Sequence, residues 1–161
     1  RLRYSVEEGP LLGTAGAIKQ AEPLLHDRFF LMYGDSYLQY DYADVMEKSQ
    51  IWPALMVVYR NEDRYDNSNV AVNGNRVVRY AKGLPTGELE YIDAGLSVLT
   101  REALKQIPAG EPSSLDAILF PKLADNCQLG AFISTKRFYE IGSPPGLEEF
   151  SQLMKDLKSF Q

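Results

Sequence analysis

Two short apolar runs constrain the fold of this chain more than any other feature of its sequence. Residues 29–33 and 54–59 contain only apolar side chains and tyrosine (FFLMY and ALMVVY). Runs of this length indicate β-strands, and an apolar side chain at every position indicates that both faces of the strand are buried. Burial on both faces is typical of strands in a parallel sheet. We therefore expect an α/β fold in which the sheet is mostly parallel.

Capping residues indicate where helices connect these strands. Thr14 is the expected N-cap of a short helix that Pro23 shortens, and Asp41 is the expected N-cap of a second helix. Ser143, followed by proline and by glutamates in the first turn, predicts the start of a C-terminal helix. The apolar residues of that helix fall on one stripe, made of Leu147, Phe150, Met154 and Leu157.

Turn residues predict antiparallel additions to the sheet. Asn73-Gly74-Asn75 separates the apolar residues 70–72 from residues 76–78, and Asn-Gly supplies the positive φ values of a tight hairpin turn. Residues 91–98 alternate and then become apolar, which predicts another strand.

The first residues of the chain also have the pattern of a strand. Leu2, Tyr4 and Val6 alternate with polar side chains from the first residue onward, as in a half-buried strand. Since nothing precedes this strand to pair with it, we expect the sequence to begin in the middle of a fold.

Charge and the counts of cysteine and histidine exclude several classes of function. The formal net charge of −5 argues against general binding to nucleic acid or to an anionic membrane, because such binding depends on Lys and Arg beside phosphates. No apolar stretch approaches the roughly 20 residues of a membrane-spanning helix. A single cysteine and a single histidine exclude an intramolecular disulfide, a cysteine-rich zinc module and a multi-histidine metal site. This composition suits the reducing cytoplasm.

Gly34-Asp35, directly after the first apolar run, is the most informative candidate site. Ligands of open α/β sheets collect at the carboxyl ends of strands. Mg²⁺ takes one or two carboxylates and completes its coordination shell with water and phosphate oxygens, so Asp35 is a candidate metal ligand. The alternative is that Asp35 only closes a turn.

Three other positions give weaker indications. Residues 12–16 (LGTAG) place two glycines and a hydroxyl at a helix start, where backbone N–H groups can bind an anion or a base edge, although ordinary turns have the same composition. Glu140 is a candidate second metal carboxylate, and Lys82 beside Gly83 is a candidate phosphate contact. Each of these two is more often an ordinary exposed side chain.

Four segments taken together, in order, are more specific than any one of them. They are residues 7–25 (EEGPLLGTAGAIKQAEPLL), 29–40 (FFLMYGDSYLQY), 91–99 (YIDAGLSVL) and 138–150 (FYEIGSPPGLEEF). They resemble the sugar-phosphate nucleotidyltransferase family, most of all its branch of mannose- and heptose-phosphate guanylyltransferases. The resemblance implies a Rossmann-like domain with a mixed, mostly parallel sheet flanked by helices. It also implies an enzyme that joins a nucleoside triphosphate to a sugar 1-phosphate, with Mg²⁺ as cofactor and release of pyrophosphate.

The resemblance further implies a role for each candidate residue. The nucleotide-binding residues would be Glu7, Gly13, Thr14 and Gly16. The sugar-binding residues would be Asp93, Ala94 and Gly95. Asp35 and Glu140 would bind the metal, and Lys82 would face the sugar phosphate as a catalytic residue together with Asp35. Two positions depart from the family pattern, because Ala81 replaces the glutamate that often precedes the lysine, and Glu140 replaces the usual aspartate.

One family element has no counterpart in these 161 residues. The resemblance places a strand and a Gly-rich triphosphate-binding loop, of the form Leu-Ala-Gly-Gly-x-Gly-Thr-Arg-Leu, upstream of Arg1, in a segment of roughly 70 residues. We therefore expect residues 1–161 to be the C-terminal two-thirds of a single domain that is incomplete at its N-terminus and inactive as a fragment.

Two alternatives remain at this point. The first is a non-catalytic regulatory module that binds a nucleotide or a sugar phosphate. The second is a glycosyltransferase with a similar nucleotide-binding sheet, which is disfavoured because Asp35-Ser36-Tyr37 lacks the second aspartate of an Asp-x-Asp motif.

Overall fold

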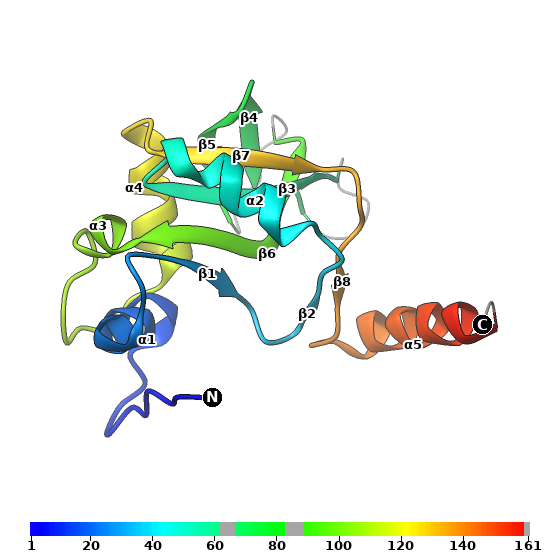
Figure 1. The fold of residues 1–161 in the computed structure, drawn as a ribbon, viewed down its shortest axis with the longest axis horizontal. Helices are drawn as coiled ribbons and strands as arrows, with labels where there is room; N and C mark the ends of the chain where they lie inside the picture. The colour runs from blue at the N-terminus through cyan, green and yellow to red at the C-terminus, as the bar shows by residue number, and fades with distance from the viewer. Residues whose placement is uncertain (62–66, 83–88, 160–161) are drawn as a thin grey trace.

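A six-stranded sheet forms the centre of the molecule in a computed structural model, which describes residues 1–61, 67–82 and 89–159 (Figure 1). Its strands, in spatial order, are β1 (Arg28–Met32), β6 (Tyr91–Thr100), β3 (Ala54–Arg60), β7 (Leu129–Ser134), β5 (Arg76–Tyr80) and β4 (Val70–Asn73). The expected strands at residues 54–59 and 91–98 and the predicted hairpin, which is β4 and β5, are confirmed. Gly74 in the hairpin turn has a φ of +63°.

The sheet is mixed, but the expectation that it is mostly parallel is wrong. Among the described strands only β3 and β7 pair in parallel. The strand β6 lies between β1 and β3 and is antiparallel to both, so β1 and β3 run in the same direction without touching. The sequence pattern misled because an apolar run carries no information on the direction of the neighbouring strand.

Helices cover both faces of this sheet. The helices α1 (Gly13–Ala21), α3 (Arg101–Leu104) and α4 (Phe120–Asp125) contribute to the core on one face. The helix α2 (Tyr42–Lys48) covers the other face. Met56 and Val58 of β3 belong to the first core, whereas Leu55 and Val57 belong to the second. The central strand is therefore buried on both sides, as its apolar run predicts.

The first apolar run has a different environment from the one predicted. In β1, Phe29 is buried, but Phe30 and Met32 are 37% and 53% exposed. β1 lies at the edge of the described sheet, with β6 on one side. The expectation of burial on both faces in a parallel sheet is wrong here, because an apolar sequence does not reveal whether its strand is central or at an edge.

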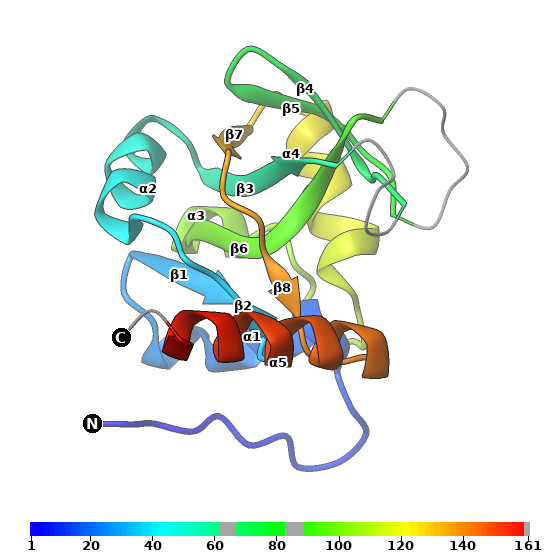
Figure 2. The ribbon, with the colours of Figure 1, turned by 90° about the vertical axis from the view of Figure 1, so that its right-hand side faces the viewer.

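The predicted N-terminal strand is also wrong. Residues 1–8 have no regular secondary structure, and Leu2, Tyr4 and Val6 are exposed. The segment leaves the body of the molecule as an extended chain (Figure 2). Period-2 alternation needs a neighbouring strand to become a sheet, and no described strand pairs with this one.

Helix caps are partly as predicted. The carboxylate of Asp41 accepts hydrogen bonds from the N–H groups of Ala43 (3.0 Å) and Asp44 (3.2 Å), which confirms it as the N-cap of α2. Thr14 is not a cap, because α1 begins one residue earlier and its N-cap is Leu12. As Pro23 predicts, α1 ends early, in the 3₁₀ turn η1 (Glu22–Leu24). A second 3₁₀ turn, η2 (Ser49–Ile51), follows α2.

A two-stranded sheet and the last helix lie beside the main sheet. The strands β2 (Ser36–Tyr37) and β8 (Tyr139–Glu140) pair in antiparallel fashion. The helix α5 (Pro144–Ser159) follows β8 and extends away from the body (Figure 1). Its predicted start after Ser143 is confirmed, since Ser143 Oγ accepts a hydrogen bond from the N–H of Gly146 at 3.2 Å. The expectation of glutamates in the first turn is wrong, because the helix begins at Pro144 and its first turn ends before Glu148. On the predicted apolar stripe, Phe150 packs on the ring of Tyr37, whereas Leu147 and Leu157 are exposed.

Replacing Asp41 by alanine tests the cap of α2. We expect Asp41→Ala to lower the free energy of unfolding by about 1 kcal/mol, because two N–H groups at the start of α2 lose their acceptor. Asp41→Asn keeps an acceptor and should unfold at nearly the same urea concentration as the unmodified chain. Equal stability of the alanine and asparagine variants would contradict this account.

Candidate functional site

Most of the predicted site residues line one cavity of about 710 Å³. It lies between the end of β1, the middle of β6, the end of β8 and the first turns of α5. Its walls include the predicted residues Thr14, Asp35, Lys82, Asp93, Ala94, Gly95 and Glu140. Glu7, Gly13 and Gly16 are not among its lining residues. The structure therefore brings the predicted metal, phosphate and sugar residues together from four separate parts of the sequence.

Two carboxylates approach each other across the small sheet. Ser36 is the register partner of Glu140, and the N–H of Ile141 donates to the backbone oxygen of Asp35 at 2.8 Å. A Cβ atom at Gly142 would lie 2.9 Å from Asp35 Oδ2 and 3.0 Å from Glu140 Oε1. Both side chains thus border the same small space, which a larger residue at position 142 would fill.

This pair has the composition of a Mg²⁺ site. Mg²⁺ is usually bound through one or two carboxylates and completes its shell with water and substrate phosphate oxygens. Glu140 is further oriented by Ser143 Oγ, which donates to its Oε2 at 2.9 Å. Within the described ranges there is no cluster of three or more His, Cys, Asp or Glu residues suited to a metal, so a cation here would rely on this pair together with substrate oxygens.

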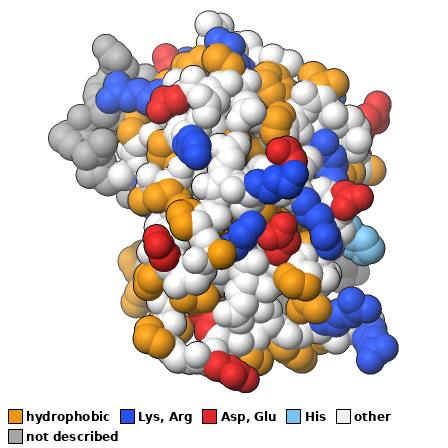
Figure 3. All heavy atoms as spheres, turned by 90° about the vertical axis from the view of Figure 1, so that its left-hand side faces the viewer, with side chains coloured by type: hydrophobic (Ala, Val, Ile, Leu, Met, Phe, Trp, Pro, Cys, Tyr) orange, Lys and Arg blue, Asp and Glu red, His pale blue; other side chains and the backbone are white. Residues whose placement is uncertain are grey.

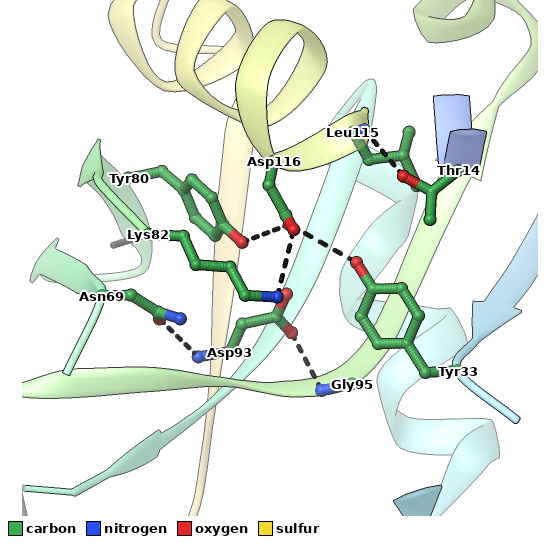
Figure 4. Close-up of polar contacts among 9 residues, drawn as sticks. All are labelled: Thr14, Tyr33, Asn69, Tyr80, Lys82, Asp93, Gly95, Leu115 and Asp116. Atoms are coloured by element: carbon green, nitrogen blue, oxygen red, sulfur yellow. Dashed lines mark hydrogen bonds and ion pairs between the residues drawn. The ribbon is translucent and has the colours of Figure 1, made fainter. Parts of the chain in front are cut away.

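A bulge in β6 turns Asp93 into the cavity. The register against β3 shifts between Met56, which faces Ser97, and Val58, which faces Asp93. Gly95 in the bulge has a φ of +82°, and a Cβ atom there would lie 2.7 Å from Ser36 Oγ. Glycine is the residue type that tolerates both conditions. The bulge allows the Asp93 carboxylate to accept a hydrogen bond from the N–H of Gly95 at 2.9 Å (Figure 4).

The carboxyl group of Asp93 has an altered acidity. Burial raises its pKa from the ordinary value of 3.8 to about 6, although the Gly95 N–H lowers it. The nearby Asp116 carboxylate raises it further and the Lys82 ammonium lowers it. Asp93 is therefore a carboxylate at neutral pH and takes up a proton in mildly acidic solution.

Asp116 is the residue of the site that the sequence analysis missed. Its carboxylate accepts hydrogen bonds from Tyr80 Oη at 2.5 Å and from Tyr33 Oη at 3.5 Å. It also forms an ion pair with Lys82 Nζ at 3.1 Å. Figure 4 shows all three donors converging on this one side chain from β5 and the end of β1. Asp116 lies in the π-helical turn η3 (Leu115–Leu119), where one acidic residue has no motif to mark it.

The two tyrosines of this cluster are hydrogen-bond donors. Burial, and then the carboxylates of Asp93 and Asp116, raise the pKa of Tyr33 and that of Tyr80 well above the ordinary value of 10. Both hydroxyls are therefore neutral at physiological pH. They can donate to Asp116 but cannot act there as bases.

The predicted nucleotide-binding residues have packing contacts of their own. The N–H groups of Ala15 and Gly16 donate to the backbone oxygen of Ser113, at 3.0 and 3.5 Å. A Cβ atom at Gly13 would lie 2.5 Å from the same oxygen. Glu7 Oε1 accepts from the N–H of Leu12 at 2.7 Å. These contacts explain why glycines stand here, and the nucleotide-binding roles stay predictions.

Figure 3 shows the charged side chains on one face of the molecule. On the face that carries the helix α3, basic and acidic side chains are interspersed (Figure 3). Among the residues that the structure describes, no helix has the length and apolar character needed to cross a membrane.

The Rossmann-like α/β fold is shared with solved nucleotidyltransferases, and the sequence is similar to those of sugar-phosphate nucleotidyltransferases. No family model matches the chain. It is 26% identical over 163 aligned residues to mannose-1-phosphate guanylyltransferase of Mycobacterium tuberculosis, covering 98% of this chain and 44% of that protein. It is also 26% identical to D-glycero-alpha-D-manno-heptose 1-phosphate guanylyltransferase of Campylobacter jejuni, covering 93% of this chain and 66% of that protein.

A similar fold is found among solved structures of nucleotidyltransferases. The inositol-1-phosphate CTP transferase from T. maritima superimposes with a TM-score of 0.73 at 25% identity, covering 91% of this chain and 63% of that one. The resemblance stated from the sequence and the Rossmann-like fold that it implies are therefore confirmed. The chain spans between two-fifths and two-thirds of the length of these proteins.

Stability measured against pH tests the environment of Asp93. Because its pKa is raised in the folded chain, Asp93 stabilises the fold most below its unfolded pKa of about 3.8 and loses this contribution as the pH rises through about 6. Asp93→Asn keeps an acceptor for Gly95 and removes the charge. Relative to the unmodified chain, its melting temperature should therefore rise between pH 4 and pH 7. The exposed Asp125 offers a control, since Asp125→Asn should change nothing over that range. Parallel pH curves for the Asp93→Asn variant and the unmodified chain would refute the assignment.

Proposed function

We propose that this chain carries the metal-binding and sugar-phosphate-binding part of a sugar-phosphate nucleotidyltransferase, an enzyme that joins a nucleoside triphosphate to a sugar 1-phosphate and releases pyrophosphate. The observation that carries the proposal is the convergence of Asp35, Glu140, Lys82 and Asp93 on one cavity. The similarity to a mannose-1-phosphate guanylyltransferase and to a heptose 1-phosphate guanylyltransferase supports the same reaction type.

The reaction is an in-line displacement at phosphorus. An oxygen of the sugar phosphate attacks the α-phosphorus of the triphosphate, the bond from that phosphorus to the β-phosphate bridging oxygen breaks, and pyrophosphate leaves with the bonding electrons. Such transfers require mainly positioning and charge neutralisation from the protein. Mg²⁺, when bound by Asp35 and Glu140, supplies positive charge beside the reacting phosphate oxygens.

The remaining residues would hold the sugar 1-phosphate. Lys82 presents an ammonium group to the cavity and is the proposed contact of its phosphate. Asp93, as a carboxylate, accepts hydrogen bonds from sugar hydroxyls. Gly95 has no side chain, so the ligand can approach its backbone closely. Gly83, the neighbour of Lys82, lies outside the described residues.

We propose that the main contacts to the triphosphate lie outside residues 1–161. The chain covers 44% and 66% of its two guanylyltransferase relatives. We propose, from the order of the four family-like segments, that residues 1–161 correspond to the C-terminal two-thirds of one domain. A Gly-rich loop encoded upstream would complete the nucleotide site.

A pyrophosphate-release assay tests the proposed reaction. The protein expressed from the complete coding region and the 161-residue chain should each be incubated with Mg²⁺ and with panels of nucleoside triphosphates and sugar 1-phosphates. We expect turnover of at least one pair by the complete protein, dependent on Mg²⁺, and none by the shorter chain. No pyrophosphate from any pair would refute the enzyme. A nucleotide sugar that still raised the melting temperature would then favour the regulatory binding module.

Two substitutions test the metal pair. Asp35→Asn and Glu140→Gln should each lower Mg²⁺-dependent turnover of the complete protein by about a hundredfold, because a bound metal contributes several kcal/mol to charge stabilisation in the transition state. The matched control is Asp44→Asn, which changes an exposed carboxylate paired with Lys48 and should leave turnover unchanged. Normal Mg²⁺ dependence in Asp35→Asn or in Glu140→Gln would remove that residue from the metal site.

A further inference from the structure

We propose that Asp116 is the positioning residue of Lys82, and that it holds the ammonium group at the place in the cavity where it meets the phosphate of a sugar 1-phosphate. The identity of that ligand rests on the function proposed above. The geometry of the cluster does not depend on it.

Lys82 needs an external constraint to act at a fixed point. It follows the last residue of β5 by two positions, and its side chain is 54% exposed. A lysine side chain has four rotatable carbon bonds and loses considerable rotamer entropy when it is fixed. In the described chain its charged partner is Asp116, at 3.1 Å, and its ammonium lies 5.8 Å from the centre of the Tyr33 ring.

Asp116 is itself held more firmly than Lys82. Its side chain is only 23% exposed. The Tyr80 hydroxyl, which donates to it at 2.5 Å, belongs to a buried ring that packs against the ring of Phe120. Its Oδ1 atom accepts hydrogen bonds from the two tyrosine hydroxyls, and its Oδ2 atom accepts one from Lys82 Nζ. The tyrosines therefore fix the carboxylate, and the carboxylate fixes the lysine.

The turn that carries Asp116 is fixed by a distant segment. Thr14 Oγ1 accepts a hydrogen bond from the N–H of Leu115 at 3.0 Å, a contact across 101 residues of sequence. Leu115 is buried in the core. The backbone next to Asp116 is thus tied to α1, which gives Thr14 a role that does not require contact with a ligand.

The arrangement leaves Lys82 able to bind an anion. An ammonium group has three protons to donate, and Asp116 accepts one of them. Asp93 also lies close enough to Lys82 for the ammonium to lower its pKa. By holding Lys82, Asp116 keeps the ammonium from pairing with Asp93 and leaves Asp93 free for sugar hydroxyls.

A double-mutant cycle tests whether Asp116 acts through Lys82. The variants are Asp116→Asn, Lys82→Ala and the two combined, and the measured quantity is the Kd of mannose 1-phosphate in the presence of Mg²⁺, by calorimetry. We expect Asp116→Asn to weaken binding about tenfold, a typical effect of losing a charge-assisted hydrogen bond. The double variant should bind as Lys82→Ala does. Losses that multiply in the double variant would overturn the proposal.

Tyr80→Phe provides a milder variant that keeps the buried ring. It should weaken binding in the same direction as Asp116→Asn, and the weakening should disappear when Lys82 is already alanine. Melting temperatures of all variants separate this effect from unfolding. A Tyr80→Phe effect that persisted without Lys82 would contradict the chain of contacts.

Acylation of lysines reports on the contact without any ligand. Labelling with an amine-reactive reagent, followed by mass spectrometry, should modify Lys82 severalfold faster in Asp116→Asn than in the unmodified chain. Lys48, paired with Asp44 on the surface, is the internal control. An unchanged rate at Lys82 would overturn the positioning role. If Lys82 is acylated faster in Asp116→Asn but the protein binds no sugar 1-phosphate, the positioning role is supported and the proposed function is refuted.

Discussion

The strand β6 joins the parts of this molecule that would otherwise be separate. It pairs with β1 on one side and with β3 on the other, and its first residue also pairs with Val70 of β4. Its bulge at Gly95 falls where the cavity lies, between the paired stretches against β3. The same strand therefore supplies both the continuity of the sheet and the bulge that turns Asp93 toward the cavity. A side chain at position 95 would collide with Ser36, and its residue would be strained at this positive φ. Glycine avoids both the collision and the strain.

Three of the acidic side chains that line this cavity are each held by a hydrogen-bond donor. Tyr80 donates to Asp116, the bulge N–H donates to Asp93, and Ser143 donates to Glu140. Burial of a carboxylate is costly unless such bonds compensate it. The compensation is incomplete at Asp93, whose pKa stays raised. Carboxylates outnumber basic side chains in the lining of this cavity, which is consistent with the metal-bound sugar phosphate proposed above as its ligand.

Local features of the sequence predicted local structure well. Asp41, Ser143 and the Asn-Gly turn each act within a few residues, and each was found where expected. Thr14 is the instructive exception. It has the residue type of a cap, yet its hydroxyl binds Leu115. A hydroxyl accepts from whichever N–H lies nearest, and a partner 101 residues away cannot be inferred from the sequence around Thr14.

The sequence by itself determined most of the strands and helices, although residues 1–8 do not form the strand that their pattern predicts. It also identified Asp35, Lys82, Asp93 and Glu140 as candidates, because periodicity, caps and ordered motifs are properties of short segments. Only the tertiary structure decided that β1 is an edge strand and that β6 runs antiparallel between β1 and β3, since an apolar run carries no information on its neighbours. Only the tertiary structure revealed Asp116. Its role depends on donors from Tyr33, Tyr80 and Lys82, which approach one another because the sheet and the turn η3 pack together, and not because of any spacing along the chain.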